Sequence, residues 1–469
     1  MKLSSLMEKN QAGPYKLMRF FFDFPGAHDL KDLQEKMDLS RSTLIKYKTY
    51  LEEEAGHLLT LSLIGESLQI RVRLGVSKEA INHFFLASSI RYQILLYLLR
   101  NQHFSIQHLS SQLMVSEATL NRHLAALNRH LAEFDLKISK GRLQGPEHQI
   151  RYFYTQLLLL TWTQEQVAKH SSSYISQKEL DLVERLINQE LSLEAKHLLH
   201  SWFYVSRKRL MEKDKLDASF KSLMAPFQDN AFYLKIQLES LRFLARYAME
   251  IDESEAMFLF AFLNSSFVLP VHTSAYILGF GGPIMDRLTQ VLQYLRGQGL
   301  LGDYTSEHVT YQLGQIISQL YFFKGRISLS AGEFDSASIH LDLHYRQLVN
   351  QVVERYFKEA ISSCLLQKIE WELSHTLFYI LEKEHAGLRI ALDLDARDIL
   401  YYRSFHDLHV SLENNRLIQV ETYEPGKQYD LIISNQLLKT YQQPQVYYLQ
   451  NHLNPSDLEA IRLYIQELS

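Results

Sequence analysis

The stretch "IQHLSSQLMVSEATLNRHLAAL" (residues 106–127) has the pattern of a helix-turn-helix. Apolar residues three and four positions apart predict a short amphipathic helix, and "MVS" then breaks the pattern. Ser116 is a good N-cap for a second helix, whose leucines predict one buried edge. In a helix-turn-helix the second helix lies in the major groove, where Arg can pair with guanine and Asn with adenine. The polar residues predicted to meet DNA here are Ser116, Thr119, Asn121, Arg122 and His123.

The same pattern occurs upstream, in "LKDLQEKMDLSRSTLIKYKTYL" (residues 30–51), at an offset of 76 residues and without a gap. Its break at "DLS" again ends in a capping serine, Ser40. The corresponding polar residues of its second helix are Arg41, Ser42, Thr43 and Lys46. The repeat therefore predicts two helix-turn-helix units.

A strand-turn-strand pattern follows each unit, in "LLTLSLIGESLQIRVRL" and "FDLKISKGRLQGP". Gly65 and Gly141 mark the two turns. These hairpins are interpreted as wings whose basic residues contact DNA phosphates beside the groove. The basic residues are Lys137, Lys140 and Arg142 in the second wing, and Arg71 and Arg73 in the first.

The charge is unevenly distributed along the 469 residues, whose net charge is −4. Residues 1–155 carry 20 Lys and Arg against 15 Asp and Glu, and the remaining residues carry 29 against 38. A basic segment of this kind is expected where only the N-terminal third meets a polyanion.

Several classes of protein are not expected. Cys364 is the only cysteine, which excludes an intrachain disulfide and a cysteine-cluster zinc site. The sequence contains no HExxH, Walker or GxSxG motif, so no enzyme, cofactor or metal is expected. It also has no long apolar run and no signal-peptide core, which predicts a cytoplasmic protein with no membrane partner.

The rest of the chain divides into a helical and an α/β part. Residues 174–384 show helical periodicity, interrupted in "LPVHTSAYILGFGGP", so residues 270–283 are the expected boundary between two bundles. From residue 385 strand and helix patterns alternate, which predicts a small α/β layer with a largely parallel sheet. The predicted fold is multidomain and mostly α.

Residues 1–160 resemble the paired winged helix-turn-helix domains of the Mga/AtxA family of Gram-positive virulence regulators, most distinctively in "GRLQGPEHQIRYFYTQLLLLTW". The resemblance implies a transcriptional regulator that binds double-stranded promoter DNA. It also implies that the second unit is the essential one and that the C-terminal domain makes a homodimer. The implied domains are winged helix-turn-helix domains at 1–75 and 76–165, helical PTS regulation domains at 170–275 and 276–384, and an EIIB-like α/β domain at 385–469.

PTS regulation domains are phosphorylated on histidine, so the resemblance implies HPr of the sugar phosphotransferase system (PTS) as a partner. The candidate histidines are His200, His272, His375 and His308. Arg207 and Arg209 are candidates to stabilise a phosphoryl group on His200, or else ordinary surface charges. In "LDLDARD" (residues 392–398) the nucleophilic Cys of a true EIIB is absent, which excludes a phosphocysteine. Its aspartates, Asp393, Asp395 and Asp398, are interpreted as solvated or capping residues rather than cation ligands.

Three alternatives differ in class from a DNA-binding regulator. A phosphotransferase enzyme is disfavoured by the missing Cys. A PTS-regulated RNA-binding antiterminator would have a small β-rich N-terminal domain, whereas this N-terminus is predicted to be helical with wings. A protein-interaction scaffold with inactive helix-turn-helix units stays open, because the charge surplus is small and Glu117 lies in the second recognition helix.

Overall fold

The computed structural model describes most of the chain, and the described residues form two compact units. One unit comprises Met1–Val291 with Ser306–Ser374, and the other comprises Leu292–Thr305 with His375–Ser469. The described residues are 1–210, 217–246, 253–273, 282–301, 305–329, 343–357, 363–383, 388–394, 418–436, 441, 445–449 and 455–468. They confirm a mostly helical, multidomain chain with a small parallel sheet near the C-terminus. No helix among these residues has both the length and the apolar character needed to cross a membrane.

The first winged unit follows a short 3-10 helix, η1 (Leu3–Leu6), and packs its recognition helix against an N-terminal helix. Its sheet is antiparallel in the order β1-β3-β2. Leu44 and Leu51 of α3 are fully buried, as the leucine pattern predicts. Its elements are α1 (Lys9–Asp23), β1 (Ala27–Asp29), α2 (Leu30–Met37), α3 (Arg41–Ala55), β2 (Leu59–Ile64) and β3 (Ser67–Val72).

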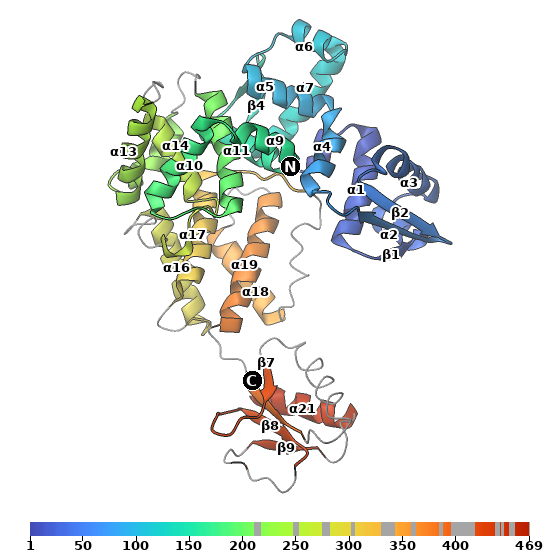
Figure 1. Ribbon diagram of the computed structural model, residues 1–469, viewed down its shortest axis with the longest axis vertical. Helices are drawn as coiled ribbons and strands as arrows, with labels where there is room; N and C mark the ends of the chain where they lie inside the picture. The colour runs from blue at the N-terminus through green and yellow to red at the C-terminus, as the bar shows by residue number, and fades with distance from the viewer. Residues whose placement is uncertain are drawn as a thin grey trace. The chain divides into compact units, whose positions relative to one another are not determined.

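The second winged unit has the same helix-turn-helix and a two-stranded wing (Figure 1). Leu120 and Leu127 of its recognition helix are fully buried, matching the positions of Leu44 and Leu51 in the first unit. Its elements are α4 (Lys78–Ala87), α5 (Ile90–Asn101), α6 (Ile106–Gln112), α7 (Glu117–Leu131), η2 (Ala132–Phe134), β4 (Lys137–Ser139) and β5 (Arg142–Gln144).

Helix α8 (Glu147–Thr161) joins this unit to the helical region, because it packs on both α4 and α11. Nearly every side chain of α8 is buried, including the charged Glu147 and Arg151. Helices α10, α11, α13 and α14 then lie together (Figure 1). The helices after α8 are α9 (Gln164–Ser171), α10 (Tyr174–Ile187), α11 (Leu193–Arg209), α12 (Ala218–Met224), η3 (Ala225–Phe227), α13 (Ala231–Arg246), α14 (Glu253–Leu263), η4 (Val271–Thr273), α16 (Pro283–Gly297), α17 (Glu307–Phe322), α18 (Leu343–Tyr356) and α19 (Ser363–Lys383).

The predicted break between two helical bundles, at residues 270–283, lies partly outside the described residues, which omit 274–281. Helix α14 ends at Leu263, the described residues 264–270 are not helical, and α16 begins at Pro283. The five expected domain ranges stay predictions.

The C-terminal sheet is parallel, in the order β7-β6-β8-β9. Ile390 and Ile433 lie in its core cluster, together with Ile461 of the closing helix. Asp395 and Asp398 lie outside the described residues, whereas Asp393 is 9% exposed and accepts hydrogen bonds from Tyr441 at 2.7 Å and Gln436 at 3.1 Å. Of the two interpretations of Asp393, solvated or capping, the first was therefore wrong, because the side chain is buried and hydrogen-bonded to Gln436 and Tyr441. The elements are β6 (Leu388–Asp393), β7 (Ile418–Thr422), β8 (Leu431–Ser434), β9 (Val446–Tyr448) and α21 (Pro455–Leu468).

His148 of α8 is a core histidine that makes stability depend on pH. Burial lowers its pKa from 6.5 to about 4, and its ring stacks on Phe220 with centroids 4.3 Å apart. Protonation of His148 therefore favours the unfolded chain, in which the pKa of this histidine is higher. Stability is retained above pH 6.5 and is lost as the pH falls toward 4, by about 3 kcal/mol in total. Urea denaturation between pH 7 and 4 should show a smaller loss for His148→Phe than for the wild type; equal losses would contradict this assignment.

Candidate nucleic-acid interface

The turn between the two helices has the same geometry in both units. Asp38 (φ 53°) and Met114 (φ 54°) both take the left-handed conformation, 76 residues apart. The amide of Leu39 donates to the carbonyl of Gln34 at 3.1 Å, and in the second unit the amide of Val115 donates to the carbonyl of Ser110 at 3.0 Å. The repeat seen in the sequence is therefore a repeat in backbone structure. Asp is a residue type enriched in this conformation, whereas nothing in the sequence signals it at Met114, since Met does not favour it.

Serine caps begin both recognition helices. The Ser116 hydroxyl accepts the amide hydrogen of Thr119 at 3.2 Å and donates to the Thr119 hydroxyl at 3.0 Å. Ser40 accepts from the amide of Thr43 at 3.2 Å in the same way. The two serines are therefore occupied in capping, which fixes the direction in which each helix leaves its turn.

The outer face of α7 presents Asn121 and Arg122, both exposed. The Arg122 guanidinium donates to the Thr119 hydroxyl at 3.0 Å, which holds the arginine along the first turns of the helix. His123 differs from these neighbours: it is half-buried, its Nδ1 makes no hydrogen bond within the described residues, and burial lowers its pKa. The structure thus brings Asn121 and Arg122 together on the surface and turns His123 toward the protein.

The second wing is attached to the recognition helix by Asn128. Its side chain donates to the carbonyl of Ile138 at 2.9 Å and accepts from the amide of Ile138 at 2.6 Å. Lys140 (φ 50°) and Gly141 (φ 72°) form the turn, as in a type I′ hairpin. The three wing cations, Lys137, Lys140 and Arg142, are all exposed. The role of Asn128 was not predicted from the sequence, because its position along the helix does not show whether its side chain binds the wing or a DNA base.

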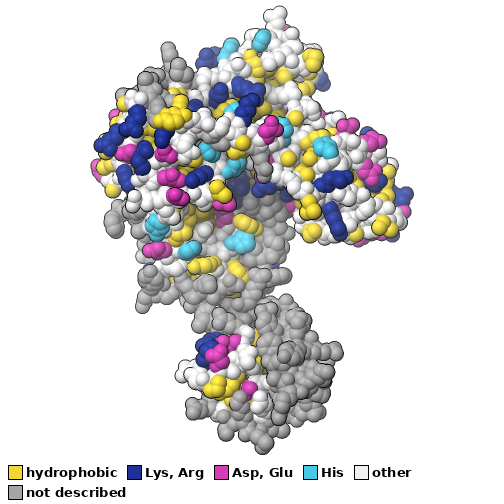
Figure 2. Space-filling model, in the orientation of Figure 1, with side chains coloured by type: hydrophobic (Ala, Val, Ile, Leu, Met, Phe, Trp, Pro, Cys, Tyr) yellow, Lys and Arg dark blue, Asp and Glu magenta, His cyan; other side chains and the backbone are white. Residues whose placement is uncertain are grey.

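The first unit presents a different surface. The Arg41 guanidinium is ion-paired with Glu66 of the wing turn, with Nη2 2.5 Å from Oε1, and both side chains are more than half exposed. Arg73 donates to the carbonyls of Gly56 at 2.7 Å and Leu59 at 3.1 Å, so it caps the end of α3 instead of extending as the pattern predicted. Ser42, Lys46 and Arg71 are exposed, and Thr43 is half-buried. On the face shown in Figure 2, acidic and basic side chains are interspersed.

The four candidate histidines lie on separate elements. His200 is half-buried on α11, where burial, Arg207 and other neighbouring basic groups lower its pKa. The others are exposed: His272 on η4, His308 on the first turn of α17 and His375 on α19.

The arginines near His200 are held by carboxylates. Arg207 is ion-paired with Glu179, and Arg209 is 5% exposed and pairs with Glu147 at 2.7 Å. The alternative that they are ordinary surface charges was wrong for Arg209, because α11 packs directly on α8.

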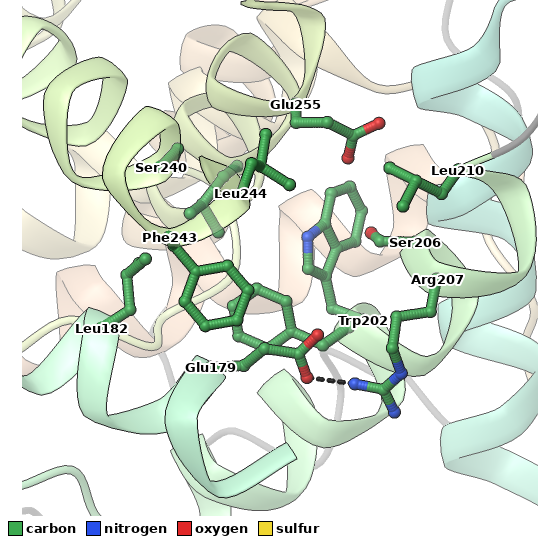
Figure 3. A pocket seen from close by; sticks show the side chains of 12 residues that line it. Glu179, Leu182, Trp202, Ser206, Arg207, Leu210, Ser240, Phe243, Leu244 and Glu255 are labelled. Atoms are coloured by element: carbon green, nitrogen blue, oxygen red, sulfur yellow. Dashed lines mark hydrogen bonds and ion pairs between the residues drawn. The ribbon is translucent and has the colours of Figure 1, made fainter. Parts of the chain in front are cut away.

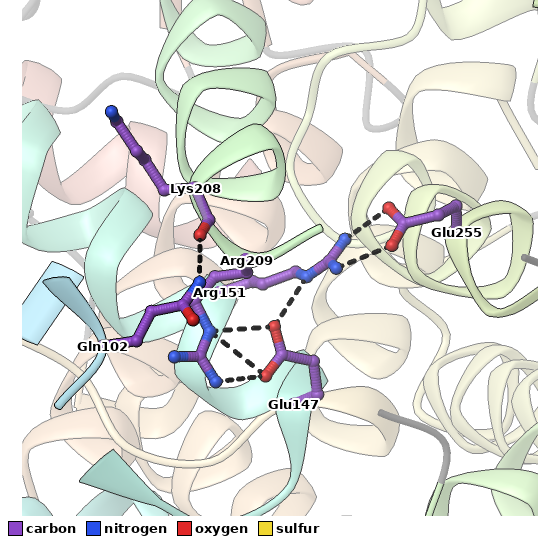
Figure 4. Close-up of polar contacts among 6 residues, drawn as sticks. All are labelled: Gln102, Glu147, Arg151, Lys208, Arg209 and Glu255. Atoms are coloured by element: carbon purple, nitrogen blue, oxygen red, sulfur yellow. Dashed lines mark hydrogen bonds and ion pairs between the residues drawn. The ribbon is translucent and has the colours of Figure 1, made fainter. Parts of the chain in front are cut away.

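Glu147 belongs to a buried ionic network between α8, α11 and α14 (Figure 4). Arg151 donates to Glu147 at 3.0 Å and makes a bidentate pair with Glu255 at 2.7 and 2.8 Å. Among the described residues the network contains two arginines and two glutamates. From α5, Gln102 also donates to the carbonyl of Lys208 at 2.7 Å. The second winged unit and the helical region are therefore joined by specific polar contacts.

Comparison with known proteins identifies this same part of the chain. Residues 74–158 match the family model of the Mga helix-turn-helix domain. The match covers α4 and α5, the helix-turn-helix, the wing and most of α8. No curated protein matches the chain. A helix-turn-helix domain is a DNA-binding module. This match confirms that the second winged unit, with most of α8, resembles the Mga helix-turn-helix domain.

Proposed function

We propose that this chain is a transcriptional regulator that binds double-stranded DNA chiefly through its second winged unit. Asn121 and Arg122 enter the major groove, and Lys137, Lys140 and Arg142 contact the neighbouring phosphates. The observation that carries the proposal is the contrast between the two recognition helices. Arg122 is exposed and hydrogen-bonded to a hydroxyl, whereas Arg41 is paired with a carboxylate. To reach a base or a phosphate, Arg41 would first have to leave Glu66.

The proposal includes regulation by phosphorylation and by dimerisation. Histidine phosphorylation by HPr adds negative charge to the helical modules. His200 is the best placed of the four histidines, since its helix α11 packs on α8. The C-terminal domain makes the homodimer. Support comes from α21, where Leu463 and Tyr464 are 57% and 50% exposed, as expected of an apolar surface that a second copy covers.

The DNA contacts are tested by fluorescence anisotropy with a duplex selected from a random library by the wild-type protein. We expect log K to fall steeply with log salt, because several phosphates are neutralised. Asn121→Ala/Arg122→Ala should weaken binding at least about tenfold, since a bidentate base contact contributes about 1–3 kcal/mol. Lys140→Ala/Arg142→Ala should reduce the salt slope by about 2.

Arg41→Ala is the control in the recognition helix of the first unit and should change the affinity by less than about twofold. Binding that does not depend on salt, or a stronger loss in Arg41→Ala than in the α7 variant, would overturn the proposed interface. Tighter binding of an RNA hairpin would favour an antiterminator instead. The proposed regulation is tested by repeating the titration after treatment with phosphorylated HPr, for the wild type and for His200→Ala. The proposed homodimer is tested by analytical sedimentation of the same samples.

A further inference from the structure

The helical region contains a small cavity between α10, α11, α13 and α14, with a volume of about 70 Å³ (Figure 3). Its walls are mainly apolar, and Trp202, Leu182 and Leu244 are buried among them. Phe243 and Arg207 also line it and keep part of their surface exposed, so the cavity opens to solvent on their side. The enclosed part holds a few water-sized groups, and a longer molecule would extend along the open side.

One polar group in this wall has no partner among the described residues. Ser206 is 8% exposed, and its buried hydroxyl makes no hydrogen bond. Figure 3 shows this hydroxyl beside the indole of Trp202, in the lining of the cavity. A buried hydroxyl without a partner is costly, and such groups are normally satisfied by protein, water or ligand. The hydroxyl therefore points to a molecule that supplies a hydrogen-bonding group at this place.

The charges in the wall are already paired. Glu179 pairs with Arg207, and Glu255 pairs with Arg151. A cationic ligand would have to displace an arginine, and an anionic ligand would have to displace a glutamate. An uncharged ligand breaks neither pair. Its apolar part would contact the aromatic side chains, which favour a ring in offset or edge-to-face packing.

We infer that this cavity binds a small uncharged molecule with an apolar, preferably aromatic, body and one hydroxyl group that hydrogen-bonds to Ser206. The site lies beside the Mga helix-turn-helix domain. Glu255 forms part of its wall and is at the same time the bidentate partner of Arg151 on α8.

The inference is tested on the full-length protein with three probes of similar shape: benzyl alcohol, benzoate and benzylammonium. Binding is measured by ligand-observed NMR, with the intrinsic tryptophan fluorescence, to which Trp202 contributes, as a second signal. Benzyl alcohol should bind at least tenfold more tightly than either charged probe. Tighter binding of a charged probe, or no binding of benzyl alcohol, would overturn the inference.

Two variants distinguish the contribution of the Ser206 hydroxyl to binding from that of the cavity itself. Ser206→Ala should weaken benzyl alcohol about two- to twelvefold without lowering the melting temperature, because it removes a hydroxyl that is unsatisfied in the free protein. Ser240→Leu adds a larger side chain to the wall from α13 and should abolish binding. Ser201→Ala is the matched control. Ser201 lies on the same helix and is also buried, but its hydroxyl donates to the carbonyl of His197 at 3.3 Å, and the variant should bind like the wild type. Wild-type affinity in Ser206→Ala, or binding in Ser240→Leu, would exclude the site.

Discussion

Replacing Arg151 by methionine is expected to lower the free energy of unfolding by about 3–5 kcal/mol, the usual cost of breaking a buried ion pair from one side. The Arg151 side chain is 1% exposed and lies between Glu147 and Glu255, with its guanidinium carbon 4.5 Å from the Phe258 ring centroid. Burial alone would disfavour its charge, but the two carboxylates outweigh burial and hold its pKa above the usual value. Methionine preserves much of the volume, so the loss arises chiefly from the two carboxylates left without this partner.

The measurement is urea denaturation followed by circular dichroism, taking the transition that includes the helical region. Arg41→Met is the matched control, because its pair with Glu66 is exposed and should contribute less than about 1 kcal/mol. Arg151→Met/Glu255→Leu should recover part of the loss, since one of the two carboxylates that lose the arginine as a partner is removed as well. If Arg151→Met and Arg41→Met lose equal stability, the buried network does not hold α8 in place.

The sequence predicts the local structure of the N-terminal third well, because the relevant signals are short-range. Ser40 and Ser116 are caps, the leucine edges are buried, and Gly65 and Gly141 mark turns, each 76 residues from its counterpart. The buried ionic network shows the limit of such signals. Glu147 and Arg151 have the spacing of an ordinary surface pair on a helix. Only the tertiary fold brings Glu255, 104 residues further along the chain, into contact with Arg151.

The candidate site was predictable as a surface but not residue by residue. The pattern places Asn121, Arg122 and His123 together, yet the packing of α7 leaves only the first two exposed. Arg41 and Arg122 both lie on recognition helices, but the repeat aligns Arg41 with Glu117 and Arg122 with Lys46, and a carboxylate in the wing turn holds Arg41. That carboxylate belongs to Glu66, which is 25 residues from Arg41 in the sequence. Helix periodicity predicts contacts only between residues three or four positions apart, so it does not predict this pair.

A further expected result concerns the two wing glycines, which the repeat makes equivalent and the packing does not. Gly141→Ala should lower the free energy of unfolding by about 3 kcal/mol. Its φ of +72° costs a side chain about 1–2 kcal/mol. A Cβ there would also lie 2.0 Å from the carbonyl oxygen of Phe104, so the wing must move away from the loop before α6. That movement strains or breaks the hydrogen bond from the amide of Phe104 to the carbonyl of Gly141, now 2.9 Å long, which contributes about 1 kcal/mol.

Gly65→Ala measures the cost of the backbone strain alone, without the contact that Gly141→Ala makes. Its φ of +61° carries a similar strain, but no atom lies within 4 Å of the added Cβ, so the cost should stay near 1 kcal/mol. Urea denaturation of the two variants side by side measures the difference. On the proposed interface only Gly141→Ala should also weaken DNA binding, because it displaces Lys140 and Arg142. Equal losses of stability would mean that the contact with Phe104 does not fix the second wing. Equal DNA affinities despite unequal stability would mean that the position of that wing does not matter for binding.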